Sequence, residues 1–312
     1  MNLFWIILFI LFGICLLFAI ILYGCFLLTF YSFKRRETGV DEYPLPKGAV
    51  YEPFYPAMIG WMKETRQMAS EDFSIRSHDG LTLRGKYYEH TKNSPIEIMF
   101  PGYRGTAERD LCGAAQRCHK LGHSAFIVDQ RAGGRSDGHV ISFGINESKD
   151  CLAWVDFVIE YFGPDVKIIL TGISMGAATV MLAAGHLLPK NVIGVLADCG
   201  YSSASDIIKK VIGDLHLPSS IVYPLVRWAG KIYGGFDVEK SDVLSSVKKA
   251  TVPIIFIHGE SDDFIPHEMS KLLYENCNTK KCFLSVPGAG HGLAYPMDPD
   301  DYIAKVQKFW QG

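Results

Sequence analysis

The stretch "LTGISMGAAT", residues 170–179, places Ser174 between Gly172 and Gly176 directly after an aliphatic run. A chain with 30 glycines can produce this pattern by chance, but the neighbouring residues make it specific. "VKIIL" (166–170) predicts a buried strand, and the alanine-rich segment after the serine predicts a helix. Glycines on both sides of a serine allow a tight strand-to-helix turn that exposes the hydroxyl. The stretch therefore predicts a nucleophile at Ser174.

Short aliphatic runs alternate with helical segments on both sides of this turn. Strands without polar alternation are typically buried on both faces, and helices between them force parallel pairing. Residues 73–90, "FSIRSHDGLTLRGKYYEH", instead predict an antiparallel hairpin about a His-Asp-Gly turn. We therefore expect a mostly parallel, doubly wound α/β sheet with an N-terminal antiparallel hairpin. Its later strands should lie at 96–100, 124–129, 166–172, 192–198, 252–259 and 281–288.

One connection, residues 201–250, is too long to be a bare loop. Its apolar residues follow helical spacing, interrupted by prolines and glycines, so it predicts a small cap of short helices. The C-terminal ends of parallel strands carry the ligand sites of open α/β sheets. A cap inserted there would cover a site around Ser174.

A serine hydroxyl needs a general base, and the base needs an orienting acid. For a nucleophile on this kind of turn, the acid and then a histidine should follow the serine in chain order. Asp262 follows the strand at 252–258, and His291 lies in the small-residue loop "SVPGAGHG" after the last strand. Asp263 and Asp198, the latter at the end of an earlier strand, are alternative acids. His258 ends its own strand, and we expect it to brace the acid loop.

Attack on a carbonyl builds negative charge on oxygen, which backbone N–H groups must stabilise. The residue after the nucleophile, Met175, is one expected donor, and Tyr103 in the loop "PGYRGTAERD" is the other. "VDQRAGGRSDG" (128–138) is a second glycine-rich loop at the same edge. It lacks the glycine order of phosphate-binding loops, so a structural role is favoured.

From about residue 70 onward the chain resembles the α/β-hydrolase superfamily. The matching pieces are "PGYRG", "VDQRAGGRSDG", "GISMG", "HGESDDFIP" and "GAGHG", in order. The chain is most similar to the YqkD-like and Bem46-like branch, which is related to prolyl oligopeptidases. The resemblance implies the α/β-hydrolase fold and favours Asp262 over Asp263, because Asp262–Pro266 matches the acid loop of the family. Pro101 departs from the family, in which many members have histidine.

The N-terminus predicts a transmembrane anchor. Residues 3–33 are almost wholly apolar and would form a helix of about 46 Å, longer than the hydrocarbon core of a bilayer. A cleavable signal peptide fits poorly, because no basic residue precedes the run and the run is too long. The basic cluster "KRR" (34–36) predicts a cytoplasmic domain. We expect an anchor at 1–33, a linker and amphipathic helix at 34–70, and the hydrolase domain at 71–312.

The composition excludes some partners and cofactors. Lys and Arg total 31 against 33 Asp and Glu, and this balance argues against nucleic acid as a partner. The eight cysteines include no CxxC pair and no histidine spacing suited to zinc, so we expect no metal or cofactor. The expected function is a serine hydrolase that acts through an acyl-enzyme on a small-molecule acyl ester, thioester or lipid. A prolyl-oligopeptidase-like peptidase and a catalytically silent, membrane-bound binding protein are the alternatives.

Overall fold

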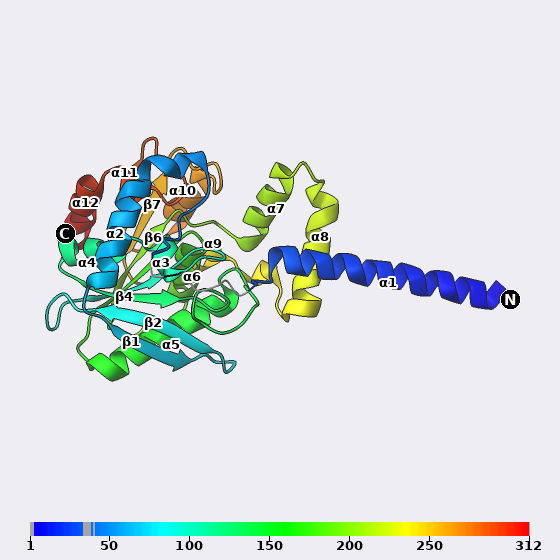
Figure 1. Ribbon diagram of the computed structural model, residues 1–312, viewed down its shortest axis with the longest axis horizontal. Coiled ribbons are helices and arrows are strands. Elements are labelled where there is room, and N and C mark those ends of the chain that lie inside the picture. The colour runs from blue at the N-terminus through cyan, green and yellow to red at the C-terminus, as the bar shows by residue number, and fades with distance from the viewer. Residues whose placement is uncertain (1–2, 34–38, 40, 312) are drawn as a thin grey trace.

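The computed structural model describes residues 3–33, 39 and 41–311. The basic cluster at 34–36, on which the predicted orientation depends, lies outside the described residues. A long helix, α1 (Leu3–Thr29), projects from one side of an α/β domain (Figure 1). It is the helix in the described part of the chain that is long and apolar enough to cross a membrane.

The domain is built on one eight-stranded sheet with the order β1-β2-β4-β3-β5-β6-β7-β8. β1 and β2 form the predicted antiparallel hairpin, and β2 also pairs antiparallel with β4. The remaining neighbours are parallel, which confirms the predicted fold class. The strands are β1 (Glu71–Arg76), β2 (Thr82–Tyr88), β3 (Ile96–Phe100), β4 (Ser124–Asp129), β5 (Ile168–Ile173), β6 (Val192–Asp198), β7 (Ile254–Gly259) and β8 (Lys281–Val286).

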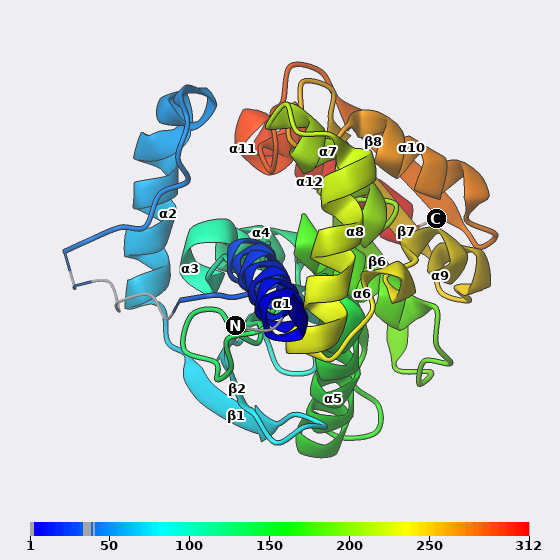
Figure 2. The same ribbon diagram turned by 90° about the vertical axis from the view of Figure 1, so that its right-hand side faces the viewer.

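Helices cover both faces of the sheet (Figure 2). One layer holds α5 (Ile145–Phe162), α6 (Met175–Ala184), α9 (Val243–Lys249) and α10 (His267–Asn276). The other layer holds α4 (Ala114–Leu121), α11 (Ala294–Met297) and α12 (Pro299–Gln311). The central strands β3 and β4 are buried along their whole length, as their largely apolar sequence predicted. The charged residue within β3, Glu97, is paired with Arg117 and His123.

The helical segment after β3 is divided in two. Residues 107–122 form one helix-like stretch in the sequence, but α3 (Ala107–Asp110) ends before α4 begins. Gly113 at the junction has φ 81°, a left-handed conformation that glycine adopts without strain. A side chain there would also lie 2.9 Å from the ring of Trp61.

The insertion between β6 and β7 is helical, as predicted. It contains α7 (Ala204–Asp214), α8 (Ser219–Ala229), the π-helical turn η2 (Gly230–Gly234), the short 3₁₀ helix η3 (Val238–Lys240) and α9. Figures 1 and 2 show α8 beside α1, and Trp228 of α8 contacts Phe18 of α1. We call α7, α8 and η2 the cap.

The C-terminal end of α1 is part of the domain core. Phe30, just beyond the helix, is fully buried and packs edge-on against Phe143 and Phe236. Tyr31 then forms an antiparallel bridge with Val140. The helix is therefore held rigidly against the domain before the chain reaches residue 34.

Residues 43–67, which we call the N-terminal strap, also pack on the domain. They include η1 (Ala49–Phe54) and α2 (Tyr55–Gln67). Met58 and Met62 of α2 are buried in a cluster with Ala289 and Leu293, which flank His291 in the chain. The sequence predicted a linker and an amphipathic helix in this region, but it could not indicate what the apolar residues contact.

Candidate active site

Ser174 occupies the junction between β5 and α6 in a strained conformation, with φ 57° and ψ −119°. Its N–H donates a 2.8 Å hydrogen bond to the carbonyl oxygen of Asp198. Gly176 is required at this turn, since a Cβ there would lie 2.0 Å from the carbonyl oxygen of Phe100. A Cβ on Gly172 would lie 2.1 Å from the carbonyl oxygen of Gly176. The two glycines therefore make room for the turn that exposes the serine.

The structure brings Ser174, His291 and Asp262 together from three different loops. His291 Nε2 lies 3.0 Å from Ser174 Oγ. His291 Nδ1 lies 2.7 Å from Asp262 Oδ2. An ionised carboxylate only accepts, so Nδ1 carries the proton and the Nε2 lone pair faces the serine hydroxyl. This is the geometry in which an imidazole can take a proton from a hydroxyl.

Asp262 is held by several donors. Its Oδ1 accepts hydrogen bonds from the N–H groups of Phe264 (3.0 Å) and Ile265 (2.8 Å). His258 Nε2 lies 3.2 Å from its Oδ2, and the expected bracing of the acid loop is thus a direct contact. Burial opposes the charge, but the hydrogen bonds from His258 and His291 hold the pKa of Asp262 well below its ordinary value. The carboxylate is therefore ionised at neutral pH.

The two alternative acids lie elsewhere. Asp263 is exposed, and its carbonyl oxygen accepts a hydrogen bond from Lys210. Asp198 ends β6 and is buried, and burial raises its pKa to about 6. Its Oδ1 has no hydrogen-bond partner in the described part of the chain. Of the three acids, Asp262 is the one whose carboxylate contacts His291.

The loop after β3 lies directly against the serine. A Cβ on Gly102 would lie 3.3 Å from Ser174 Cβ, so the backbone preceding Tyr103 approaches the nucleophile closely. Gln130 Nε2 donates a 2.6 Å hydrogen bond to the carbonyl oxygen of Pro101 and supports the loop at the position where the sequence departs from the family. Met175 is the first residue of α6, and the N–H groups of a first helical turn have no partner within the helix.

The second glycine-rich loop, 128–138, has a structural role. The carboxylate of Asp129 accepts hydrogen bonds from the N–H groups of Ala107 (2.9 Å) and Arg135 (3.1 Å). Arg131 is buried and pairs with Asp150 and Asp79. These bonds join the loop to α3, α5 and the hairpin.

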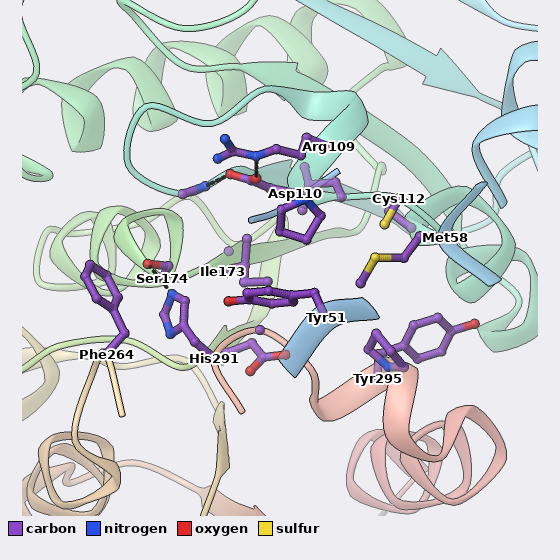
Figure 3. A pocket seen from close by; sticks show the side chains of 18 of the residues that line it. Tyr51, Met58, Arg109, Asp110, Cys112, Ile173, Ser174, Phe264, His291 and Tyr295 are labelled. Carbon is purple, nitrogen blue, oxygen red and sulfur yellow. Dashed lines mark hydrogen bonds and ion pairs between the residues drawn. The ribbon is translucent and has the colours of Figure 1, made fainter. Parts of the chain in front are cut away.

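A pocket of about 610 Å³ extends from Ser174 into the domain. Figure 3 shows Ser174, His291 and Phe264 at one end, Tyr51 and Ile173 in the middle, and Met58, Cys112 and Tyr295 at the other. Apolar and aromatic side chains make up the larger part of the lining, and the charged side chains of Arg109 and Asp110 lie beside them. Burial, followed by nearby acidic groups, raises the pKa of the Tyr51 phenol to about 12, so this group is neutral.

Nothing in the sequence indicated that Tyr51 and Met58 line this pocket. Both belong to the N-terminal strap, more than 100 residues before the nucleophile. Only packing of the strap on the loop that carries His291 places them there.

The ligand atoms of Cys199, Asp262 and His291 all lie within 4.8 Å of one another, which makes these residues a candidate metal site. Burial raises the pKa of the Cys199 thiol well above its ordinary value, so this thiol is neutral in the metal-free protein. Asp262 and His291 are already hydrogen-bonded to each other. The three groups therefore fit a hydrogen-bonded pair beside a neutral thiol better than a metal centre.

Comparisons with known proteins agree with this fold. The sequence profile described as "Serine hydrolase (FSH1)" matches residues 218–293, which include Asp262 and His291. The uncharacterized protein YqkD of Bacillus subtilis is 28% identical over 78% of this chain and 80% of its own. The mouse mitochondrial palmitoyl-protein thioesterase ABHD10 is 28% identical over 69% of this chain and 73% of its own.

A solved esterase of Pyrococcus furiosus superposes with a TM-score of 0.64 at 20% identity, over 88% of this chain and 98% of its own. At this identity the match supports the fold alone. Several findings support the same classification. They are the family profile, the curated relatives and the mostly parallel sheet with its strand-to-helix serine turn. The fold is that of the α/β hydrolases, and the family profile and the curated relatives support this superfamily for the chain.

Proposed function

We propose that this protein is a membrane-anchored serine hydrolase that cleaves carboxylic esters or thioesters through an acyl-enzyme. The observation that carries the proposal is the continuous hydrogen-bonded chain from Ser174 Oγ through His291 to Asp262, at the end of a largely apolar pocket. The serine at positive φ on a strand-to-helix turn supports the same role.

In the proposed mechanism, His291 Nε2 accepts the hydroxyl proton as Ser174 Oγ attacks the carbonyl carbon of the substrate. The carboxylate of Asp262 orients the ring and stabilises the imidazolium. The backbone N–H groups of Tyr103 and Met175 donate to the developing oxyanion. His291 then protonates the leaving alcohol or thiol. Water, activated by the same ring, releases the acyl group and restores the serine.

The pocket indicates the substrate class. A cavity of about 610 Å³, lined largely by apolar side chains, favours a substrate with a long hydrocarbon acyl group. The pocket extends from Ser174 towards Met58 (Figure 3). This is the direction in which the acyl part of a bound ester would lie. The thioesterase among the relatives makes an acyl-thioester a second chemical form of the same substrate class.

The proposed anchor would hold this chemistry at a membrane. The 27 apolar residues of α1 are long enough to cross a bilayer. The proposed orientation, with the catalytic domain in the cytoplasm, follows from the basic residues at 34–36. Digestion of the domain by a protease added outside intact cells would contradict this orientation.

Labelling by a fluorophosphonate probe tests the nucleophile. The wild-type protein should be labelled, and the Ser174→Ala variant should not. The matched control is Ser203→Ala. Ser203 is the N-cap residue of α7, where its side chain accepts a hydrogen bond from the N–H of Asp206, and this variant should be labelled like the wild type. Equal labelling of Ser174→Ala and wild type would overturn the proposal, as would an unlabelled wild type.

A substrate series separates the activity from the alternatives. Under the proposal, p-nitrophenyl esters and acyl-thioesters of increasing chain length are hydrolysed faster than an X-Pro amide. Faster cleavage of the amide would favour a peptidase. No turnover of any substrate by a protein that the probe does not label would favour a binding protein.

A further inference from the structure

The anchor helix and the cap form one continuous contact. The rings of Phe18 in α1 and Trp228 in α8 meet edge to face, with centroids 6.3 Å apart. Tyr233 of η2 donates a 3.2 Å hydrogen bond to the carbonyl oxygen of Ala19 and packs on Tyr23. Wherever this part of α1 lies relative to a membrane, the cap lies at the same depth.

The length of α1 determines that depth. Residues 3–17 of the helix extend beyond the contacts with the cap and cover about 22 Å. The hydrocarbon core of a bilayer is about 30 Å thick and takes about 20 helical residues. A span counted from Leu3 therefore reaches Leu22, and it includes Phe18 and Ala19, which contact the cap. Trp228 and Tyr233 are thus level with the edge of the hydrocarbon, where these residue types are enriched.

The cap also exposes an apolar stripe at helical spacing. Ile221, Trp228 and Ile232 are 63%, 54% and 58% exposed, and Leu225 lies between them at positions i, i+4, i+7 and i+11. Leu215 and Leu217, in the turn that precedes α8, are 64% and 47% exposed. Tyr223, Val226 and Ala229 of α8 are buried, and α8 packs on α1, α7 and η2. We call the stripe with these two leucines the cap patch.

We propose that the cap patch inserts into the lipid leaflet through which α1 leaves the membrane. This inference rests on the proposed membrane anchor, and the occupant it assigns to the patch is the acyl-chain region just beneath the lipid headgroups. Several large apolar side chains in contact with water are costly, and burial beside α1 removes them from water without any rearrangement. The cap is then an interfacial element. The expectation that it covers the site is not met, because the residues that line the pocket of Ser174 include the N-terminal strap and no residue of the cap.

This arrangement also determines where the C-terminal edge of the sheet, which carries Ser174, lies relative to the membrane. The loop after β3, which lies against Ser174, hydrogen-bonds to the last residues of α1 through Tyr103 and Arg104. The C-terminal edge of the sheet therefore faces the same leaflet as the cap patch. An acyl lipid leaving that leaflet would approach Ser174 without crossing bulk water, which narrows the proposed substrate class to membrane lipids or lipid-modified molecules.

Photocrosslinking in the full-length protein tests the insertion. The photoreactive residue p-benzoylphenylalanine is placed at position 221 by amber suppression, and the protein is reconstituted into phosphatidylcholine–phosphatidylglycerol vesicles. Two positions are matched controls: Phe9 of α1, which is 76% exposed, and Leu187, which is 95% exposed and precedes β6 at the opposite edge of the sheet. After irradiation, mass spectrometry measures the fraction of protein that carries a lipid adduct.

Positions 9 and 221 should both form lipid adducts, and position 187 should give at least tenfold less. Adducts at 9 but not at 221 would overturn the insertion of the cap and leave the anchor intact. No adduct at 9 would overturn the anchor itself. A protein–protein adduct at 221 in place of a lipid adduct would show that another chain covers the patch, which also overturns the proposal. Fluorophosphonate labelling of each variant checks that it is folded.

Discussion

The phenol of Tyr103 donates a 2.7 Å hydrogen bond to the carbonyl oxygen of Thr29, the last residue of α1. The guanidinium of Arg104 donates to further carbonyl oxygens at the same helix end, those of Leu27, Leu28 and Tyr31. The last carbonyls of a helix have no partners within it, and a cation there also interacts favourably with the helix dipole. The loop proposed to hold the oxyanion is therefore attached to the proposed membrane anchor.

Removal of the Tyr103 hydroxyl should slow catalysis without weakening substrate binding. Tyr103→Phe keeps the backbone N–H but loses one hydrogen bond to Thr29. A neutral hydrogen bond contributes about 1 kcal/mol, so we expect kcat to fall about fivefold with KM unchanged. Ester hydrolysis in detergent micelles measures both constants. Tyr161→Phe, at an exposed tyrosine of α5, is the control, and an equal loss in that variant would contradict the coupling.

Replacing each of two adjacent aspartates should show that Asp262, and not Asp263, is the acid that supports His291. Asp262→Asn keeps the size of the side chain but removes the charge that orients and stabilises the ring of His291. In the Ser-His-Asp template the corresponding change lowers kcat about 10⁴-fold, and we expect a loss of at least about 10³-fold. Asp263→Asn should stay within about twofold of wild type on the same ester. A large loss in Asp263→Asn alone would reassign the acid.

The buried carboxyl of Asp198 should make stability depend on pH. Its pKa is raised from 3.8 to about 6 by burial, so the folded protein binds more protons than the unfolded chain between these values. Stability is then lost as the pH rises from about 4 to 6, by at most about 3 kcal/mol. Asp198→Asn should unfold at a higher temperature than wild type at pH 7.5, and the difference should shrink towards pH 4.

The same variant also tests Asp198 as an alternative acid. Because Asp198 makes no contact with His291 comparable to that of Asp262, Asp198→Asn should retain ester hydrolysis within about tenfold of wild type. Loss of activity equal to that of Asp262→Asn would contradict this assignment.

A larger residue at the far end of the pocket should shorten the preferred acyl chain. Met58→Trp adds volume beside Cys112 and Tyr295, at the end remote from Ser174 (Figure 3). We expect kcat/KM for a C12 ester to fall about tenfold relative to a C4 ester, because the longer chain loses two or three buried methylene groups. A uniform loss for both esters would show that the acyl chain does not reach this end. The unfolding temperature checks that the variant is folded.

Local sequence was sufficient to predict the strands and the turn that carries Ser174. Every predicted strand is present within a few residues, because unbroken aliphatic runs between helices have few alternatives to buried parallel strands. The same local signal failed at Gly113, where helical spacing continues across a residue that the fold places in a left-handed turn. Chain order and the family's acid loop predicted Asp262 and His291, which the structure brings into contact.

By itself, the sequence determined the fold class, the serine turn and the long apolar N-terminal helix, since each depends on residue types within a short window. It proposed Asp262 and His291 only through chain order and the family's acid loop. The tertiary structure decided which acid contacts His291, that Tyr51 and Met58 line the pocket, and that Tyr103 binds the end of α1. Those contacts join residues separated by tens to more than two hundred positions. They depend on how whole elements pack, and local spacing carries no record of that packing.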